Sequence, residues 1–426
     1  MSKYDKASLV HIPSGYKSGT LYNVLPNDAD GDFNFTRAST ATRVDENGLI
    51  ETIAIGTPRL NYPLLDGVVQ DNPTLLLEPQ RTNYLPYSED FSNAAWTKFA
   101  AGTASVPVVT ANYAISPDGS QNASRVQFDK GTGTGASNQS IISDTVTVTS
   151  GLTTNKSIFV KSNTSEEYDM VLYGSTDATG TNVAKIRITN QWQRFDVFGT
   201  IASTSTGLSF GLREISVTGL SNTADVLIWG AQIENGSYAT SYIPSLTGSQ
   251  TTRSADAANG AGTADDFNNT EGVFFSQISR FGTPTTNEYW LISINDNSGQ
   301  NLATIGFNQT YGNLFGRLKA ANSTQFQNTS TSSAIGLSYK LAIRYSSTEA
   351  AFFIDGFKKQ TISNPTAFTG TLSRLDFSFG GGSSRFYGNT KEVIAFNEAL
   401  SDTELEALTS YDSFNSMATE LLFTIE

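Results

Sequence analysis

The side chains that most often carry out chemistry in proteins are sparse in this sequence. Its 426 residues include one histidine, His11, and no cysteine. A histidine-based catalytic triad, a multi-histidine metal site, a zinc–thiolate site and a thiol nucleophile are therefore excluded. The phosphate-binding pattern G-x-x-x-x-G-K-[ST] is also missing from the sequence.

Carboxylates are plentiful, but their spacing does not indicate hydrolysis. A glycoside hydrolase needs two carboxylates that flank one cleft. The acidic pair Glu166 and Glu167 stands in a Ser/Asn-rich turn, where solvated side chains are the rule. Carboxylates that are distant in sequence could still meet in space, so catalysis stays an alternative. We predict no catalytic residues and no enzymatic activity.

Aromatic and polar side chains offer a simpler chemistry, which is sugar binding. A pyranose ring stacks on one or two exposed aromatic rings, while Asn, Asp, Gln or Arg bind its hydroxyl groups. Aromatic residues make up 11% of the chain, and several stand near expected loops or strand ends. The predicted carbohydrate-binding residues are Tyr113, Tyr168, Tyr173, Tyr289, Trp290 and Tyr311. Packing in a hydrophobic core is the alternative for each of them.

Metal binding is left open by the sequence. Residues 28–32 resemble the start of a calcium loop, but the last loop position is Ser39, where such a loop needs Glu. Structural calcium is the one cofactor that the sequence leaves open, in either sandwich. For each candidate ligand the alternative is a role in forming a turn. The candidate calcium ligands are Asp296, Asp355 and Asp376. No other cofactor is indicated.

Net charge and hydropathy argue against two classes of partner. The chain carries 40 acidic and 27 basic side chains, which gives a net charge of −13. Binding to nucleic acid or to an anionic membrane surface needs an excess of Lys and Arg. No run of 18 apolar residues and no apolar signal-peptide segment is visible. We therefore expect neither nucleic-acid binding nor membrane insertion.

The candidate residues must be positioned by β-structure. Short segments with alternating apolar residues, separated by Gly, Asn and Ser turns, recur over residues 85–256 and again over 265–412. Eight or more such strands without amphipathic helices between them are typical of a sandwich or jelly roll. The predicted fold class is all-β, with two tandem β-sandwich (jelly-roll) domains preceded by an irregular N-terminal β segment.

The N-terminal segment has too few alternating apolar positions to bury a core of its own. We predict that it is an attachment arm with a small β connector, and the alternative is a strand that completes the first domain. The expected boundaries are 1–84 for this segment, 85–256 for the first domain, 257–264 for a linker, 265–412 for the second domain and 413–426 for a C-terminal tail.

One helix is expected, near the end of the second domain. Ser401 or Asp402 would cap it, with Glu404 in its first turn and Leu405 and Leu408 on its apolar side. The tail that follows has apolar residues at roughly helical spacing. It could form a second short helix that docks on a neighbouring chain.

Several stretches of the sequence resemble a known protein family. Residues 75–96 read LLLEPQRTNYLPYSEDFSNAAW. This stretch is similar to one that recurs in bacteriophage tail-fibre and other virion appendage proteins, where it opens a jelly roll like the carbohydrate-binding modules of family 4/9. Residues 35–51 resemble the segment that precedes it, with Arg43 where the usual pattern has Tyr, and residues 226–256 resemble the end of the jelly roll. Residues 385–411 resemble the end of a concanavalin-like or laminin-G-like sandwich.

The resemblance implies a virion appendage protein of a phage, such as a tail or head fibre. Its sandwiches would bind host-surface glycan through weak sites that many copies make strong. The implied partners are other virion proteins, reached through the N-terminal segment, and further copies of this chain in a homo-oligomer. The implied location is the virion, assembled in the host cytoplasm, which suits a chain without cysteine, and released by lysis. Two alternatives stay open: a structural or decoration protein that binds no glycan, and the binding part of a secreted carbohydrate-active enzyme.

Overall fold

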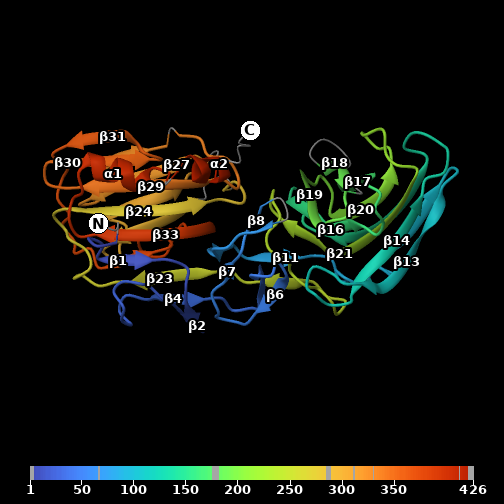
Figure 1. The fold of residues 1–426 in the computed structure, drawn as a ribbon, viewed down its shortest axis with the longest axis horizontal. Helices are drawn as coiled ribbons and strands as arrows, with labels where there is room; N and C mark the ends of the chain where they lie inside the picture. Colours follow the sequence, from blue (N-terminus) through green and yellow to red (C-terminus); the bar gives the residue numbers. More distant parts are fainter. Residues whose placement is uncertain are drawn as a thin grey trace.

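The computed structural model contains two β-sandwiches that lie side by side along the longest axis of the molecule (Figure 1). It describes residues 4–65, 68–174, 182–284, 289–309, 312–329, 331–411 and 413–420. In these residues the regular structure is almost entirely antiparallel β-strand, with two short helices near the C-terminus. The predicted all-β class with two sandwiches is confirmed.

The first sandwich consists of two five-stranded sheets. One sheet, in spatial order, contains β12 (Thr97–Ala101), β15 (Gln139–Thr147), β20 (Ser205–Arg213), β17 (Tyr168–Gly174) and β18 (Val183–Ile188). The other, called here the β13–β19 sheet, contains β13 (Ser105–Ala114), β14 (Ala123–Asp129), β21 (Thr223–Asn235), β16 (Thr153–Ser162) and β19 (Gln193–Thr200). Successive side chains of a strand point to opposite faces. In β14 this sends Val126 and Phe128 into the core and leaves Arg125 and Gln127 on the outer face.

The second sandwich is larger, and its sheets combine strands from both ends of the chain. The eight-stranded sheet contains β31 (Phe357–Ser363), β30 (Glu349–Ile354), β29 (Ser338–Tyr345), β24 (Gly272–Ser279), β33 (Gly388–Phe396), β10 (Thr74–Leu77) and β7 (Leu60–Asn61), and β1 (Leu9–His11) also pairs with β33. The nine-stranded sheet contains β2 (Tyr16–Lys17), β3 (Thr20–Leu21), β4 (Phe33–Thr36), β23 (Ala257–Ala261), β32 (Arg374–Asp376), β25 (Trp290–Asn295), β26 (Leu302–Phe307), β27 (Leu314–Ala320) and β28 (Ser323–Asn328).

This arrangement corrects two predicted boundaries. Residues 1–84 were expected to form a separate arm, but within their described part β1 and β10 pair with β33, and β4 pairs with β23. These strands complete the second sandwich, so the alternative that they complete the first is also wrong. The expected linker 257–264 contains β23, which is a strand of the same sandwich. The first sandwich is therefore inserted between two parts of the second. The sequence pattern did not show this because the strands are short and their partners lie far away in the chain.

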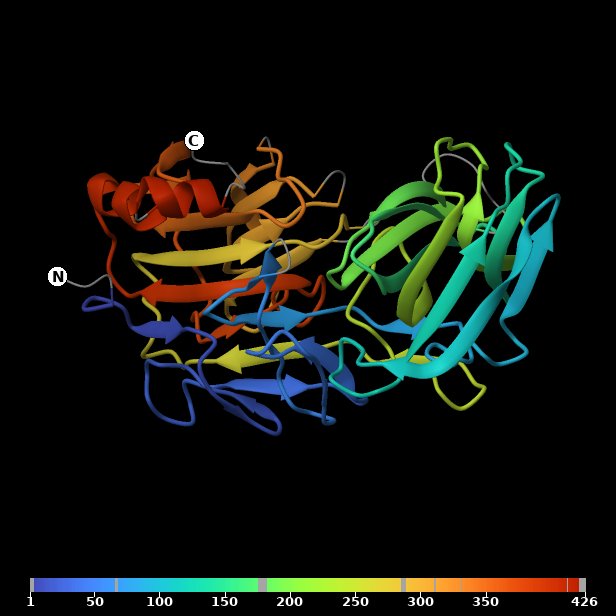
Figure 2. The same ribbon diagram turned by 45° about the vertical axis from the view of Figure 1, so that its right-hand side comes forward.

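Small two-stranded units connect the sandwiches. The pairs are β5 (Ala41–Val44) with β6 (Ile50–Ile53), β8 (Leu64–Leu65) with β9 (Val68–Val69), and β11 (Arg81–Asn83) with β22 (Thr251–Arg253). The β11–β22 pair brings together the points where the chain enters and leaves the first sandwich. Figure 2 shows these elements between the two sandwiches, in blue and yellow-green.

A buried ion cluster fixes the junction. Arg59 pairs with Glu78 at 2.6 Å and also with Asp256, Arg253 pairs with Glu78 at 2.8 Å, and Arg37 pairs with Asp256 at 3.2 Å. The side chains of all five are at most 3% exposed. Burial opposes the ionisation of Glu78, but the two guanidinium groups and hydrogen bonds from Ser241 outweigh it and lower its pKa to about 2. Arg37, Glu78, Arg253 and Asp256 belong to the stretches that resemble the virion proteins, and here they join the sandwiches.

The expected helix is confirmed as α1 (Asp402–Thr409). Ser401 caps it, and Ser401 and Glu404 form a capping box in which each side chain binds the backbone of the other residue. Its buried Leu405 belongs to a hydrophobic cluster that also contains Val10 and Phe275 of the eight-stranded sheet. α2 (Phe414–Glu420) follows in the expected tail. No helix within the described residues is long and apolar enough to cross a membrane.

Candidate functional site

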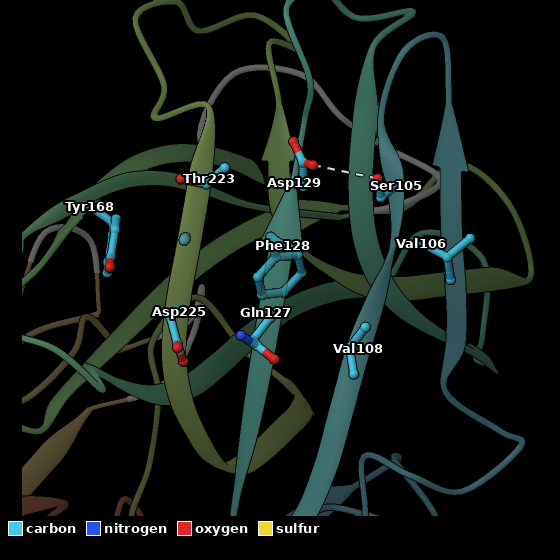
Figure 3. A pocket seen from close by; sticks show the side chains of 10 residues that line it. Ser105, Val106, Val108, Gln127, Phe128, Asp129, Tyr168, Thr223 and Asp225 are labelled. Carbon is cyan, nitrogen blue, oxygen red and sulfur yellow. Dashed lines mark hydrogen bonds between the residues drawn. The ribbon is translucent and has the colours of Figure 1, made fainter.

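The outer face of the β13–β19 sheet carries a row of polar side chains, called here the platform. Strand register places Val108 beside Gln127 and Gln127 beside Asp225, and in the next row it places Ser105 beside Asp129 and Asp129 beside Thr223. Paired residues of an antiparallel sheet lie on the same face. The six side chains therefore form one surface across β13, β14 and β21, and Figure 3 shows them from close by. The surface is hollowed into a pocket of about 410 Å³.

Tyr168 forms one wall of this pocket. The loop before it is tied to β21 by two hydrogen bonds, from the Asn163 amide N–H to the Asp225 carbonyl (3.0 Å) and from Asn163 Nδ2 to the Asp225 carboxylate (3.2 Å). The Tyr168 hydroxyl lies 2.9 Å from the Thr164 hydroxyl. These bonds hold a half-buried ring beside Asp225 at the edge of the platform, as Figure 3 shows.

Arg125 links the platform to a second tyrosine. Its Nε donates to both carboxylate oxygens of Asp225, at 2.9 and 3.2 Å, and its Nη2 donates to Asp225 as well. The Asp225 bonds raise the pKa of Arg125. The guanidinium lies 5.2 Å from the centre of the Tyr113 ring, which is 44% exposed. Tyr113, Arg125, Asp225 and Tyr168 thus form a continuous series of aromatic and charged groups on one open face.

The same sheet face continues into a larger cleft at the junction, with a volume of about 690 Å³. β16 pairs with β21, so Lys161 lies beside Leu227 and shares the face of Arg125. The cleft walls come from both sandwiches and from the β5–β6 hairpin. Trp192 and Phe159 are half-buried in it. We call this second hollow the junction cleft.

The structure brings together two of the six predicted tyrosine and tryptophan residues and corrects two others. Tyr113 and Tyr168 flank the platform. Tyr173 and Trp290 are each 1% exposed and lie in the cores of the first and second sandwich, so no sugar ring can stack on them. β17 has its last five residues buried and β25 is buried throughout, so alternation did not show which side chains face outward.

Tyr289 does not extend the site. It is half-buried, and its ring centre lies 5.4 Å from that of Phe315 in the second sandwich. The remaining predicted residue, Tyr311, lies outside the described residues.

Sequence reasoning missed the polar residues of the platform. Arg125, Gln127 and Asp129 alternate with the core residues of β14, and this alternation could have assigned them to the outer face. Trp192 lines the junction cleft and was not among the predicted binding residues. Its proximity to Lys161 depends on the pairing of β16 with β19, for which the sequence holds no direct signal.

The described residues hold no group of three or more His, Cys, Asp or Glu side chains that could bind a metal ion. The aspartates proposed as calcium ligands have other partners: Asp296 accepts bonds from Ser298 and Asn301, Asp376 pairs with Arg374, and Asp355 accepts from the Lys340 amide.

His11 is fully buried between the sheets of the second sandwich. Its Nδ1 lies 2.9 Å from Asn23 Oδ1, and its ring packs edge-on against Phe33. Burial lowers the pKa of His11 to about 4.

Comparisons with known proteins give structural neighbours only. No protein-family model matches the chain, and no curated protein matches its sequence. Among solved structures, domain 4 of AbnA, a GH43 extracellular arabinanase from Geobacillus stearothermophilus in complex with arabinotriose, is 15% identical. The match covers 41% of this chain and 81% of that domain, with a TM-score of 0.31.

Two further neighbours are similarly distant. The IT-sialidase CBM40 of Ruminococcus gnavus, bound to α2,3-sialyllactose, is 16% identical over 35% of this chain and 87% of its own, with a TM-score of 0.30. A heptameric SAP-like pentraxin from Limulus polyphemus is 15% identical over 34% of this chain and 71% of its own, with a TM-score of 0.27. At these values the likeness does not extend to function, and the virion role stays a prediction from the sequence resemblance.

Proposed function

We propose that the protein is a glycan-binding protein whose site is the platform of the first sandwich. The observation that carries the proposal is the placement of two accessible tyrosine rings near one charged and polar row: Tyr168 lines the platform pocket, and Tyr113 lies beside Arg125. A pyranose presents an apolar ring face to an aromatic side chain and hydroxyl groups to polar ones. The platform offers both kinds of contact.

The roles of the platform residues follow from their chemistry. Tyr168 stacks on the sugar ring in the pocket, and Tyr113 extends the contact to a neighbouring sugar unit. Asp225 and Asp129 accept hydrogen bonds from sugar hydroxyls, while Gln127 both donates and accepts. Arg125 holds the Asp225 carboxylate in place through a bidentate hydrogen bond, so this acceptor is already positioned before the sugar binds.

We further propose that this binding serves a phage virion appendage, as a tail or head fibre, with no catalytic step and no cofactor. The support is the sequence resemblance of residues 35–51, 75–96 and 226–256. In this proposal the chain assembles in the host cytoplasm, forms a homo-oligomer, attaches to other virion proteins and leaves the cell by lysis. Many copies on one particle raise the avidity of a weak single site.

The main alternative keeps the virion and removes the glycan, so that the sandwiches act as spacers and protein contacts. A glycan array and host-cell binding assay with the full chain in multivalent display separates the two. We expect Tyr168→Ala and Tyr113→Ala each to weaken glycan binding about tenfold, because each removes a stacking surface. Tyr22→Ala is the matched control, since Tyr22 is 36% exposed and also lies near a cation, Lys17, but on the second sandwich.

The results have clear consequences. Binding that is lost in the two platform variants and kept in the control supports the proposal. An absence of binding to glycans and host cells favours the structural alternative. Release of shorter sugars from a bound glycan would show catalysis and contradict a pure binding role.

A further inference from the structure

The junction cleft contains two aromatic rings and two cations in an alternating arrangement. β16 and β19 are paired so that Phe159 lies beside Arg194, and the guanidinium carbon is 5.2 Å from the centre of the Phe159 ring. Lys161, two residues after Phe159, and Trp192, two residues before Arg194, line the same cleft. Lys161 Nζ lies 5.9 Å from the centre of the Trp192 ring. Each ring therefore has a positive charge beside it.

Both cations have unused capacity for a negative ligand. Arg194 donates from Nη1 to the Thr240 carbonyl and from Nη2 to the Ser157 hydroxyl, while its buried Nε has no hydrogen-bond partner among the described residues. Lys161 has no carboxylate within 4 Å in the part of the chain that the structure describes, and its Nζ lies beside the Trp192 ring. Because opposite charges attract, the two cations at this wall favour a negatively charged ligand.

The charge of the cleft differs from that of the platform. Its lining includes three cations, Lys161, Arg194 and Arg43, and its only acidic residue is Glu78. Glu78 is already paired with two arginines of the junction cluster, and Arg43 is paired with Glu51. The lining of the platform pocket instead includes two carboxylates, Asp129 and Asp225. The same sheet face thus carries the acidic platform pocket and the cationic junction cleft. A cationic cleft is notable in a chain whose net charge is −13.

We infer that the junction cleft binds an acidic sugar, so that the ligand of this protein is an anionic glycan. The inference rests on the proposed glycan binding and adds the charge of the ligand. The sugar ring stacks on Trp192, and its carboxylate binds Lys161 Nζ at the cleft wall that also contains the Arg194 guanidinium. Charge-assisted hydrogen bonds of this kind are about twice as strong as neutral ones. Uncharged units of the same glycan extend along the sheet face toward the platform.

The test compares acidic polysaccharides with their own uncharged forms. The probes are polygalacturonate, hyaluronate and polysialic acid, each beside the carboxyl-reduced product of the same polymer, with the full chain in multivalent display. Neutral glycans on the same array report on the platform. We expect at least one acidic polymer to bind about tenfold more tightly than its reduced form, and the difference to shrink as salt rises.

Lys161→Gln tests the cleft itself, because the Lys161 side chain makes no hydrogen bond to any described residue and its loss should leave the fold intact. We expect it to remove most of the preference for the acidic form, and Lys161→Arg to retain it. The matched control is Lys359→Gln, since Lys359 also lies over an aromatic ring, Phe357 at 4.9 Å, but on an exposed strand of the second sandwich. An unchanged melting temperature of each variant shows that the fold is intact.

The outcomes separate this inference from the proposed function. Equal binding of acidic and reduced polymers, or an acid preference that Lys161→Gln leaves intact, overturns the inference while glycan binding stands. Binding of neutral glycans alone has the same meaning. If neither acidic nor neutral glycans nor host cells bind, the proposed function fails, and the inference fails with it.

Discussion

The two sandwiches have the same class of fold but are built differently from the chain. The core cluster of the first contains residues from Leu85 to Ile233, all from one continuous stretch. The core cluster of the second combines residues near the N-terminus, such as Leu9 and Phe33, with residues as far along as Ala395. The first sandwich can therefore bury its apolar surface alone, whereas the second needs both ends of the chain to meet. The difference shows that a domain boundary read from local patterns can misplace strands whose partners are distant.

The largest expected effect comes from separating the sandwiches. A fragment of residues 85–250 contains the whole first core and should fold with a cooperative thermal transition. A fragment of residues 265–426 lacks β1, β4, β10 and β23. Without them β33 pairs only with β24, β32 pairs only with β25, and Phe274 loses part of its core. We expect this fragment to be unfolded or aggregated by circular dichroism and analytical ultracentrifugation.

A shortened chain that keeps both ends of the sequence provides the control. A chain in which residues 84–250 are replaced by a short Gly/Ser loop keeps every strand of the second sandwich. The loop is easily closed, because Asn83 and Thr251 are paired in β11 and β22. This chain should recover the cooperative transition. Independent folding of residues 265–426 would show that the N-terminal strands are accessory and not part of the core.

The predictability of the fold follows the same division. The turns and alternating strands of the first sandwich are local features, and β14 shows them clearly in residues Ala123–Asp129. The apolar run from Leu75 to Leu77 forms a buried strand, as such a run indicates, but nothing nearby in the sequence indicates that its partner is β33, beginning at Gly388. Local sequence determines whether a segment tends to form a strand. Which strand it pairs with depends on packing over the whole chain.

The candidate site was predictable to a similar extent. Tyr113 and Tyr168 were selected because aromatic residues near loops can be exposed, and the structure places both on one face. Trp290 was selected for the same reason and is a core residue. The cation–aromatic pairs of the junction cleft depend on strand register, which no local pattern reveals. Residue type thus predicted the chemistry, and only the fold identified which residues share a surface.

The second prediction concerns the coupling between the sandwiches. Glu78→Gln removes one charge from the buried cluster, takes away the carboxylate with which Arg253 pairs, and leaves Arg59 with Asp256 alone. Loss of one partner in a buried pair costs about 3–5 kcal/mol. We expect calorimetry of the full chain to show a lower melting temperature and a separation of the two sandwiches into distinct transitions.

An exposed ion pair gives the comparison for Glu78. Glu167 pairs with Arg187 at 2.9 Å on the surface of the first sandwich, where both side chains are at least half exposed. Glu167→Gln should cost less than about 1 kcal/mol. A Glu78→Gln protein as stable as the Glu167→Gln protein would mean that the junction cluster does not couple the sandwiches.

The third prediction is a pH effect confined to the second sandwich. The pKa of His11 is lowered by burial from 6.5 to about 4 in the folded state, so between these values the unfolded chain binds a proton that the folded chain does not. Stability is therefore fully present above pH 6.5 and falls as the pH drops toward 4, by up to about 3 kcal/mol. Urea unfolding of the full chain, followed by fluorescence across this range, measures it. In His11→Gln the pH dependence from this residue should disappear, and a variant with an unchanged slope would assign it to other groups.

The smallest effect is expected in the first sandwich, and it has the opposite sign. Asp144 lies on β15 between the core residues Ile142 and Val146, is 6% exposed, and has a buried carboxylate oxygen without a partner among the described residues. Burial raises its pKa from 3.8 to about 6. Here the folded state binds the extra proton, so the contribution to stability is present below pH 3.8 and is lost as the pH rises through 6.

Between pH 4 and 6 the two sandwiches should thus respond in opposite directions, the second gaining stability and the first losing it as the pH rises. Asp144→Asn removes the charge at neutral pH and keeps the shape, so it should stabilise the 85–250 fragment by about 1 kcal/mol at pH 7 and have little effect at pH 4. Thermal unfolding of the fragment at both values measures this. Asp196→Asn, on the exposed edge strand β19, is the control and should show no such difference. If Asp144→Asn left the stability of the fragment unchanged at pH 7, water or a polar neighbour would be solvating the carboxylate. Only the pH effect of His11 would then remain.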